Sequence, residues 1–237
     1  MSNRLLVVGA HAADFVWRAG GAIAVTTAAG GTAEVLALSY GERGESGELW
    51  QEEGQTVENV KRLRHEEATR AAEILGATFT SLDLGDYPLE IDKEALARLA
   101  DAIRAFAPDT VVTHTDRDPI NPDHGLVYGA VERARTLAAG AGVPSAFATV
   151  RPPALYCFEP HQPELCNFVP TDFVDITPVF ERKVAAMAEM KAQRYLQDYY
   201  AERAGHRGNH ARRSSGNNAI RQAEAFQRMT PRVGTEL

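Results

Sequence analysis

The sequence has no long apolar run. No stretch approaches the ~20 consecutive apolar residues of a membrane-spanning helix, and the apolar segment before Gly9 is too short for an export signal. The chain also lacks internal repeats, low-complexity tracts and any linker that would separate two domains. We therefore expect one cytoplasmic protein with no membrane partner.

Cysteine is scarce, with only Cys157 and Cys166 in 237 residues. A domain of this length buries roughly 70% of the surface that its unfolded chain exposes, so it needs no disulfide or structural metal to fold. We expect both thiols to be reduced and to act as small hydrophobic side chains. With 44% hydrophobic and 24% charged residues, the composition is that of an ordinary globular domain.

Positive charge is also in short supply. The chain carries 25 Lys and Arg against 32 Asp and Glu, a net charge of −7. This balance argues against a nucleic-acid partner, because such affinity comes largely from neutralising phosphates. The charge is uneven, however, since residues 203–232 carry +6 and the rest of the chain −13. The basic segment predicts contact with a small anionic ligand or an acidic partner surface.

Short apolar runs that alternate with helical patterns are abundant. This alternation is typical of an α/β protein whose mostly parallel sheet is covered by helices on both faces. The best-defined helix covers residues 56–75 and ends at a C-capping Gly76, and further helices are predicted at 92–106 and 124–138. The predicted strands are Leu5–Val8, Val35–Leu38, Phe79–Leu84, Thr110–His114, Leu155–Phe158 and Phe173–Ile176.

The C-terminal region has a different pattern. Thr177 and Pro178 supply an N-cap and a first helical residue for a long helix to about Ala201. Residues 205–218, rich in Gly, Ser, Asn and Arg, predict an irregular basic arm before a short helix at 219–228. We therefore assign residues 1–204 to one α/β domain, and residues 205–237 to a basic C-terminal arm and short helix of that same domain.

Polar residues cluster where the predicted strands end. Ligands of open parallel sheets bind outside the carboxyl ends of the strands, and His11 and Asp14 follow the first strand there, with His114 and His124 after the fourth. A His–Asp–His set with an open fourth position is typical of catalytic zinc sites. A single His and Asp in a loop more often form a turn hydrogen bond and a helix cap, but two clusters at one edge favour a metal.

The segments Val7–Asp14 (VVGAHAAD) and Asn121–His124 (NPDH) carry a family resemblance. They resemble the two motifs of the LmbE-like superfamily of N-acetylglucosaminyl-phosphatidylinositol de-N-acetylases (PIG-L), Rossmann-like zinc enzymes. The resemblance implies a Rossmann-like, LmbE-like sheet and a Zn²⁺ ion bound by His11, Asp14 and His124.

Two positions depart from the family pattern, in which the motifs usually read AHPDDE and HPDH. Ala13 stands where these deacetylases have their catalytic aspartate, and Asn121 replaces the first histidine of the second motif. Amide hydrolysis requires a base to activate water, and alanine provides none. The departures therefore indicate that the metal site is kept while the reaction has changed.

Four blocks of sequence are similar to the 4-oxalomesaconate hydratase branch of this superfamily: residues 10–21, 41–46, 83–89 and 156–164. That branch adds water to 4-oxalomesaconate, also drawn as 4-carboxy-2-hydroxymuconate, giving 4-carboxy-4-hydroxy-2-oxoadipate in the protocatechuate and gallate 4,5-cleavage pathways. The resemblance implies a zinc-dependent hydro-lyase that acts on a small tricarboxylate and forms a homo-oligomer. The alternatives are a zinc-dependent de-N-acetylase of an N-acetylated sugar and a non-catalytic carboxylate-binding relative.

Hydration of a conjugated double bond requires a base for water and an acid for the neighbouring carbon. We expect Glu45 and His161 to transfer these protons. The alternatives are that Glu45 is a solvated loop acid and that His161 caps a carbonyl in a turn. Because arginine forks bind carboxylates, the predicted substrate-binding residues are Arg18, Arg43, Arg212 and Arg213, together with His114.

Overall fold

A computed structural model describes residues 3–234 of the chain. Its strands are β1 (Arg4–Gly9), β2 (Thr32–Ala37), β3 (Thr78–Ser81), β4 (Thr110–Thr113), β5 (Ala154–Phe158), β6 (Asp172–Asp175) and β7 (Ala223–Arg228). Its α-helices are α1 (Asp14–Ala28), α2 (Val57–Leu75), α3 (Lys93–Phe106), α4 (Pro122–Ala139), α5 (Phe180–Ala188) and α6 (Leu196–Ser215). None of the helices within residues 3–234 has the length and apolar character needed to span a membrane.

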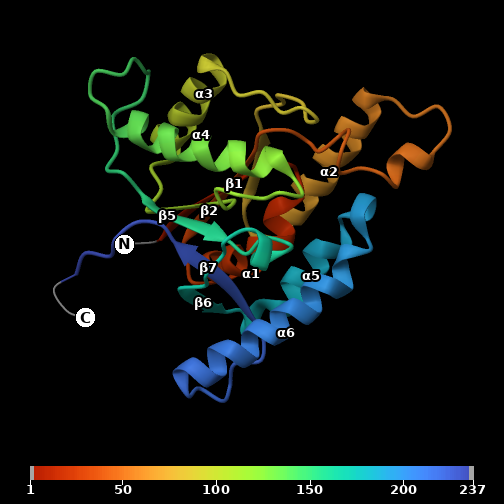
Figure 1. Cartoon of the computed structure of the whole chain (residues 1–237), viewed down its shortest axis with the longest axis vertical. Helices are drawn as coiled ribbons and strands as arrows, with labels where there is room; N and C mark the ends of the chain where they lie inside the picture. The colour runs from red at the N-terminus through yellow and green to blue at the C-terminus, as the bar shows by residue number, and fades with distance from the viewer. Residues whose placement is uncertain (1–2, 235–237) are drawn as a thin grey trace.

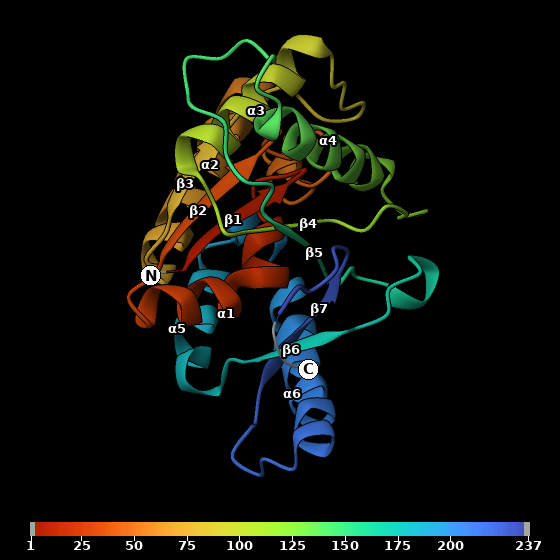
Figure 2. The ribbon, with the colours of Figure 1, turned by 90° about the vertical axis from the view of Figure 1, so that its left-hand side faces the viewer.

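The strands form one seven-stranded sheet in the order β3-β2-β1-β4-β5-β7-β6. Strands β6 and β7 lie beside α6 (Figure 1), and Figure 2 labels all of the strands. Strands β1 to β5 pair in parallel, whereas β7 runs antiparallel to both β5 and β6. Helices cover both faces, with α3 and α4 on one side and α1 and α5 on the other (Figure 2). The predicted α/β class with a mostly parallel sheet is confirmed.

Alternate residues of the central strands pack into two separate hydrophobic cores, one on each face of the sheet. In β1, Leu5 and Val7 pack with α1, α2 and α5, whereas Leu6 and Val8 pack with α3 and α4. Side chains alternate along a strand, so a strand that is covered on both faces is apolar throughout. This is why the parallel strands could be predicted from continuous apolar runs.

The helix predicted at 56–75 is confirmed together with its caps. The side chain of Thr56 accepts a hydrogen bond from the N–H of Asn59 at 3.2 Å. At the other end, Gly76 takes a left-handed conformation with φ of 77°, which glycine adopts without a steric penalty. Single residues in the sequence therefore predicted where α2 begins and ends.

The prediction of one long helix from Thr177 to Ala201 is wrong. The segment divides into a 3₁₀ turn at Thr177–Val179, α5, a second 3₁₀ turn η4 (Lys191–Gln193), and α6. The break falls at Met190, whose ψ of 67° is not helical. It buries Met190 in the core around α1 and also buries the side chain of Gln193, so packing overrides local helix propensity here.

The predicted irregular arm and short helix are also wrong. Helix α6 continues to Ser215, past the expected boundary at residue 204, and the predicted short helix is strand β7. Gly208 does not break the helix; a Cβ there would lie 2.0 Å from the carbonyl oxygen of Arg221, so glycine permits close packing of the returning chain. Part of the basic charge is neutralised within the chain, because Arg203 and Arg207 both donate to the buried carboxylate of Glu159.

Strand β7 places a buried carboxylate against the middle of α1. Glu224 accepts hydrogen bonds from the backbone N–H groups of Gly21 and Ala22, each at 2.8 Å, and from Lys183 Nζ at 2.6 Å. Lys183 Nζ also donates to the carbonyl of Trp17 at 2.9 Å. The C-terminal strand and α5 thereby fix α1, the helix that begins at Asp14.

This buried pair leads to a stability prediction. Replacing Glu224 with alanine leaves Lys183 charged and unpaired, so Glu224→Ala should lower the free energy of unfolding by about 3–5 kcal/mol, measured by urea denaturation. Glu181→Ala, on the exposed face of the same region of α5, is the control. A loss below about 1 kcal/mol for Glu224→Ala would show that the pair is not important for the fold.

Candidate metal centre and active site

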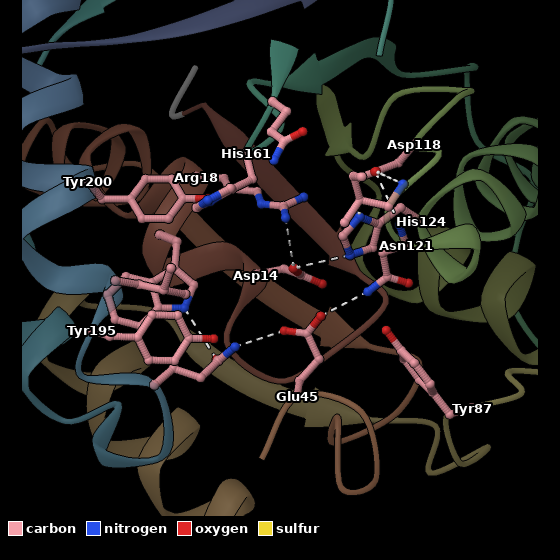
Figure 3. A pocket seen from close by; sticks show the side chains of 15 residues that line it. Asp14, Arg18, Glu45, Tyr87, Asp118, Asn121, His124, His161, Tyr195 and Tyr200 are labelled. Atoms are coloured by element: carbon pink, nitrogen blue, oxygen red, sulfur yellow. Dashed lines mark hydrogen bonds and ion pairs between the residues drawn. The ribbon is translucent and has the colours of Figure 1, made fainter. Parts of the chain in front are cut away.

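Segments that follow β1, β2, β4 and β5 meet at the carboxyl edge of the sheet. They bring Asp14, Glu45, His124 and His161 to one pocket of about 210 Å³ (Figure 3). This is smaller than the roughly 300–1,000 Å³ of sites for drug-sized ligands. The pocket therefore suits a small molecule.

His11, Asp14 and His124 form a cluster that could hold a metal ion. Each residue is buried and offers one ligand atom, and these atoms all lie within 4.8 Å of one another. His11 Nδ1 lies 3.6 Å from Asp14 Oδ2, and His124 Nε2 lies 3.8 Å from Asp14 Oδ1. Both ring nitrogens are buried with no hydrogen-bond partner, which is costly for polar atoms unless a ligand satisfies them.

The second nitrogen of each of these rings faces a carboxylate. His124 Nδ1 lies 2.7 Å from Asp118 Oδ2, and His11 Nε2 lies 3.4 Å from Asp123 Oδ2. Such carboxylate–histidine pairs fix the tautomer and the ring orientation of metal-binding histidines, and they raise the basicity of the ligand nitrogen. Two nitrogens and one carboxylate, aimed at a common point and supported from behind, fit Zn²⁺.

The electrostatics of the cluster favour a cation. Burial lowers the pKa of His11, but Glu45, Asp123 and Asp14 outweigh it and raise that pKa to about 9. Burial, with His114 and Arg18, lowers the pKa of His124 to about 3. The carboxylates around His11 thus favour positive charge at this point.

His114 lies beneath the cluster, and it does not line the pocket. Its ring stacks on that of His124 with 4.0 Å between centroids, and its Nε2 lies 3.1 Å from Asp14 Oδ2. His114 Nδ1 accepts a hydrogen bond from Arg18 Nη1 at 3.1 Å, so Nε2 of the neutral ring carries the proton and donates it to Asp14. His114 is therefore placed to orient Asp14, and the structure does not support the expected contact with substrate.

Glu45 projects from the loop after β2. Asp86, in the loop after β3, holds that segment in place. The buried carboxylate of Asp86 accepts hydrogen bonds from the N–H groups of Arg43 and Gly44 at 2.9 and 2.7 Å. Glu45 Oε1 accepts from Asn121 Nδ2 at 2.8 Å (Figure 3), and Oε2 accepts from Gln193 Nε2 at 2.8 Å. Gln193 has no sequence signal, because it lies in the segment predicted as uninterrupted helix.

His161 lines the opposite side of the pocket from Glu45 (Figure 3). Its ring stacks on Tyr199 with 4.2 Å between centroids, and its carbonyl accepts hydrogen bonds from Tyr199 Oη and from Arg203. Burial lowers the pKa of His161, and Arg18 and Arg203 lower it further. Aromatic contacts with α6 thus hold the imidazole in place.

Of the arginines expected to bind substrate, Arg18 lines the pocket. Its guanidinium lies 5.5 Å from the ring centre of Phe158, and its Nε has no hydrogen-bond partner. Arg43 instead donates to Glu42 and to the carbonyl of Asp86, and its side chain is 47% exposed. Arg212 and Arg213 lie in the last turn of α6. The structure brings none of these three to the pocket.

The His–Asp–His cluster at the edge of a mostly parallel sheet is typical of a known class of protein. Residues 6–135 match the GlcNAc-PI de-N-acetylase (PIG-L) family, and the chain belongs to this family. The N,N′-diacetylchitobiose deacetylase of Pyrococcus horikoshii shares the fold, with a TM-score of 0.79 at 18% identity over 96% of this chain and 84% of the deacetylase.

Two matches from Pseudomonas putida are far more similar in sequence. The 4-oxalmesaconate hydratase of that organism is 46% identical over 235 residues, which cover 98% of this chain and 91% of the relative. The crystal structure of GalB, a 4-carboxy-2-hydroxymuconate hydratase, superposes with a TM-score of 0.95 at 46% identity and covers 99% of each chain. The expected similarity to this hydratase branch is confirmed.

The cluster predicts how metal binding depends on single ligands. Because three protein ligands leave little redundancy, His124→Ala should remove most of the bound zinc, measured by elemental analysis of the purified protein. His206→Ala, on the exposed surface of α6, should keep its metal. Full zinc content in a correctly folded His124→Ala protein would remove His124 from the ligand set.

Proposed function

We propose that this protein is a zinc-dependent hydratase that converts 4-oxalomesaconate, or its tautomer 4-carboxy-2-hydroxymuconate, to 4-carboxy-4-hydroxy-2-oxoadipate in protocatechuate and gallate 4,5-cleavage. The observation that carries the proposal is the match to the P. putida hydratases along nearly the full length of both chains. The site geometry supports it, because a candidate metal site, an acid and an imidazole share one small pocket.

In the proposed reaction the hydroxyl group of water joins one carbon of the double bond, and a proton joins its neighbour. A zinc ion bound by His11, Asp14 and His124 would supply a Lewis acid for the negative charge that develops on the conjugated 2-oxo-acid end. Glu45 and His161 line the pocket from different loops. They are placed to divide the two proton transfers, one taking the proton of water and the other delivering a proton to carbon.

The de-N-acetylase alternative lacks a residue that it needs. Ala13, at the position of the family's catalytic aspartate, is 2% exposed and packs in the core around α1. Alanine has no ionisable group, so residue 13 cannot take a proton from water. Glu45 approaches the cluster from another loop, with its Oε1 3.7 Å from His11 Nδ1, so a carboxylate is present but on a different side of the site.

We infer that Arg18 binds a carboxylate of the substrate. Arg18 lines a pocket that otherwise presents the acids Asp14, Glu45 and Asp118, and a small polyanion needs a fixed positive charge there. Self-association, contact of the basic segment with an anionic ligand or an acidic partner surface, and a cytoplasmic location stay predictions. Gel filtration of the intact protein tests the first.

The function itself is tested by following the substrate. Loss of the conjugated ultraviolet absorbance of 4-carboxy-2-hydroxymuconate should occur on adding the purified protein, and it should stop after chelation and return when Zn²⁺ is restored. An N-acetylated sugar should release no acetate in parallel assays. Undiminished turnover by protein shown to be metal-free would contradict the zinc-dependent proposal.

If Glu45 and His161 transfer protons, replacing either one should greatly lower kcat without changing the zinc content. A positioned general acid or base contributes about 10²–10⁴ in rate, so Glu45→Ala and His161→Ala should each lower kcat at least about a hundredfold with normal zinc content. A change confined to KM would reassign that residue to substrate binding.

A further inference from the structure

The carboxylate of Glu45 is held between two side-chain amides. Asn121 Nδ2 donates to one oxygen and Gln193 Nε2 to the other, both at 2.8 Å. Asn121 caps α4 at the sheet edge, whereas Gln193 belongs to the turn η4 between α5 and α6. Two segments that are far apart in sequence therefore fix the same acid.

The orientation of each amide is set by its other end. An amide can face a carboxylate with its NH₂ group or, unfavourably, with its oxygen. Asn121 Oδ1 accepts the N–H of Asp123 at 3.2 Å, so its NH₂ group faces Glu45. Gln193 Oε1 accepts from Arg64 Nη2 at 3.1 Å and, more weakly, from Trp17 Nε1 at 3.5 Å. Since both of these groups only donate, the NH₂ group of Gln193 must also face Glu45.

Arg64 is itself held rigidly inside the protein. Its side chain is 0% exposed, Nη1 donates to Glu67 Oε2 at 3.0 Å, and Nε donates to the carbonyl of Tyr40 at 3.3 Å. Glu67 also accepts the N–H of Ala192 at 3.2 Å. The Arg64–Glu67 pair on α2 thus holds both the backbone of η4 and the amide of Gln193.

A buried ion pair gives no strong stabilisation in general, because desolvation offsets much of the attraction. Well-packed apolar residues of similar volume often replace such a pair with no loss of stability. What apolar residues would not provide is a donor that fixes the direction of one amide. Arg64 does not line the pocket, so it can influence the reaction only through Gln193 and η4.

We propose that Arg64 and Gln193 are positioning residues for the reaction, in which Arg64 orients the amide of Gln193 so that it donates to Glu45. This rests on the proposed function, since it takes Glu45 to be a proton-transfer group. In this relay from Arg64 through Gln193 to Glu45, Gln193 donates to the Glu45 oxygen that Asn121 does not contact. It thereby fixes the direction in which the carboxylate faces the substrate.

The first test compares variants of similar size in the zinc-loaded enzyme. Gln193→Met removes the donor and should lower kcat at least about tenfold while KM changes less than about threefold. Gln193→Glu puts a carboxylate next to Glu45 and should cost more than Gln193→Met. Gln197→Met is the control, because that amide donates to the carbonyl of Met187 at 3.2 Å and should leave kcat unchanged.

A double-mutant cycle separates positioning from general stability. In a Glu45→Gln background, Gln193→Met should have less than about a twofold further effect, because the group that Gln193 positions is already lost. Arg64→Lys should lower kcat in the same direction, with Arg62→Lys on the exposed face of α2 as its control. Equal, additive losses in both backgrounds would overturn the proposal.

A measurement without turnover distinguishes this proposal from the proposed function. In protein with ¹⁵N-labelled glutamine, the side-chain amide of Gln193 should exchange with D₂O much more slowly than that of exposed Gln51, and Arg64→Lys should speed it. If the wild-type protein shows no hydration, the proposed function fails while this result still tests the relay. Exchange as fast as that of Gln51 would overturn the relay itself.

Discussion

The site is built around two buried histidine nitrogens that have no hydrogen-bond partner among the described residues, and a bound cation would satisfy both. His11 Nδ1 and His124 Nε2 are buried beside the carboxylate of Asp14 with no hydrogen-bond partner in the described chain. Unpaired buried polar atoms are costly, yet Asp118 and Asp123 hold both rings in this orientation from behind. The surrounding fold serves this arrangement, because parallel strands deliver the cluster to one edge and the Glu224–Lys183 pair fixes the helix that begins with Asp14.

Two positions distinguish this site from the deacetylase motifs, Ala13 and Asn121. Ala13 removes the acid that a de-N-acetylase needs and fills a core position instead. Asn121, at the position of the family's histidine, caps α4 and donates to Glu45. The same position that departs from the deacetylase pattern thus supports the acid that we assign to hydration. In the proposed function the metal-binding cluster is kept, and proton transfer is assigned to Glu45 on the loop after β2.

The sequence predicted those features that depend on nearby residues. Strands covered on both faces read as apolar runs, and Thr56 and Gly76 marked the ends of α2. The C-terminal region could not be predicted, because its structure depends on distant contacts: Gly208 permits packing against Arg221, and residues 223–228 become a strand by pairing with β5 and β6. The cluster residues His11, Asp14 and His124 were found by motif. Gln193 was not, because its contact with Glu45 spans 148 residues.

The most direct test of the account is a crystal structure of the zinc-loaded protein with the hydrated product, using anomalous scattering at the zinc edge. The account predicts one zinc peak about 2.0–2.2 Å from His11 Nδ1, His124 Nε2 and an oxygen of Asp14. It also predicts that the hydroxyl group of the product lies within hydrogen-bond reach of Glu45 or His161. Zinc bound elsewhere, or a product whose hydroxyl group reaches neither residue, would contradict it.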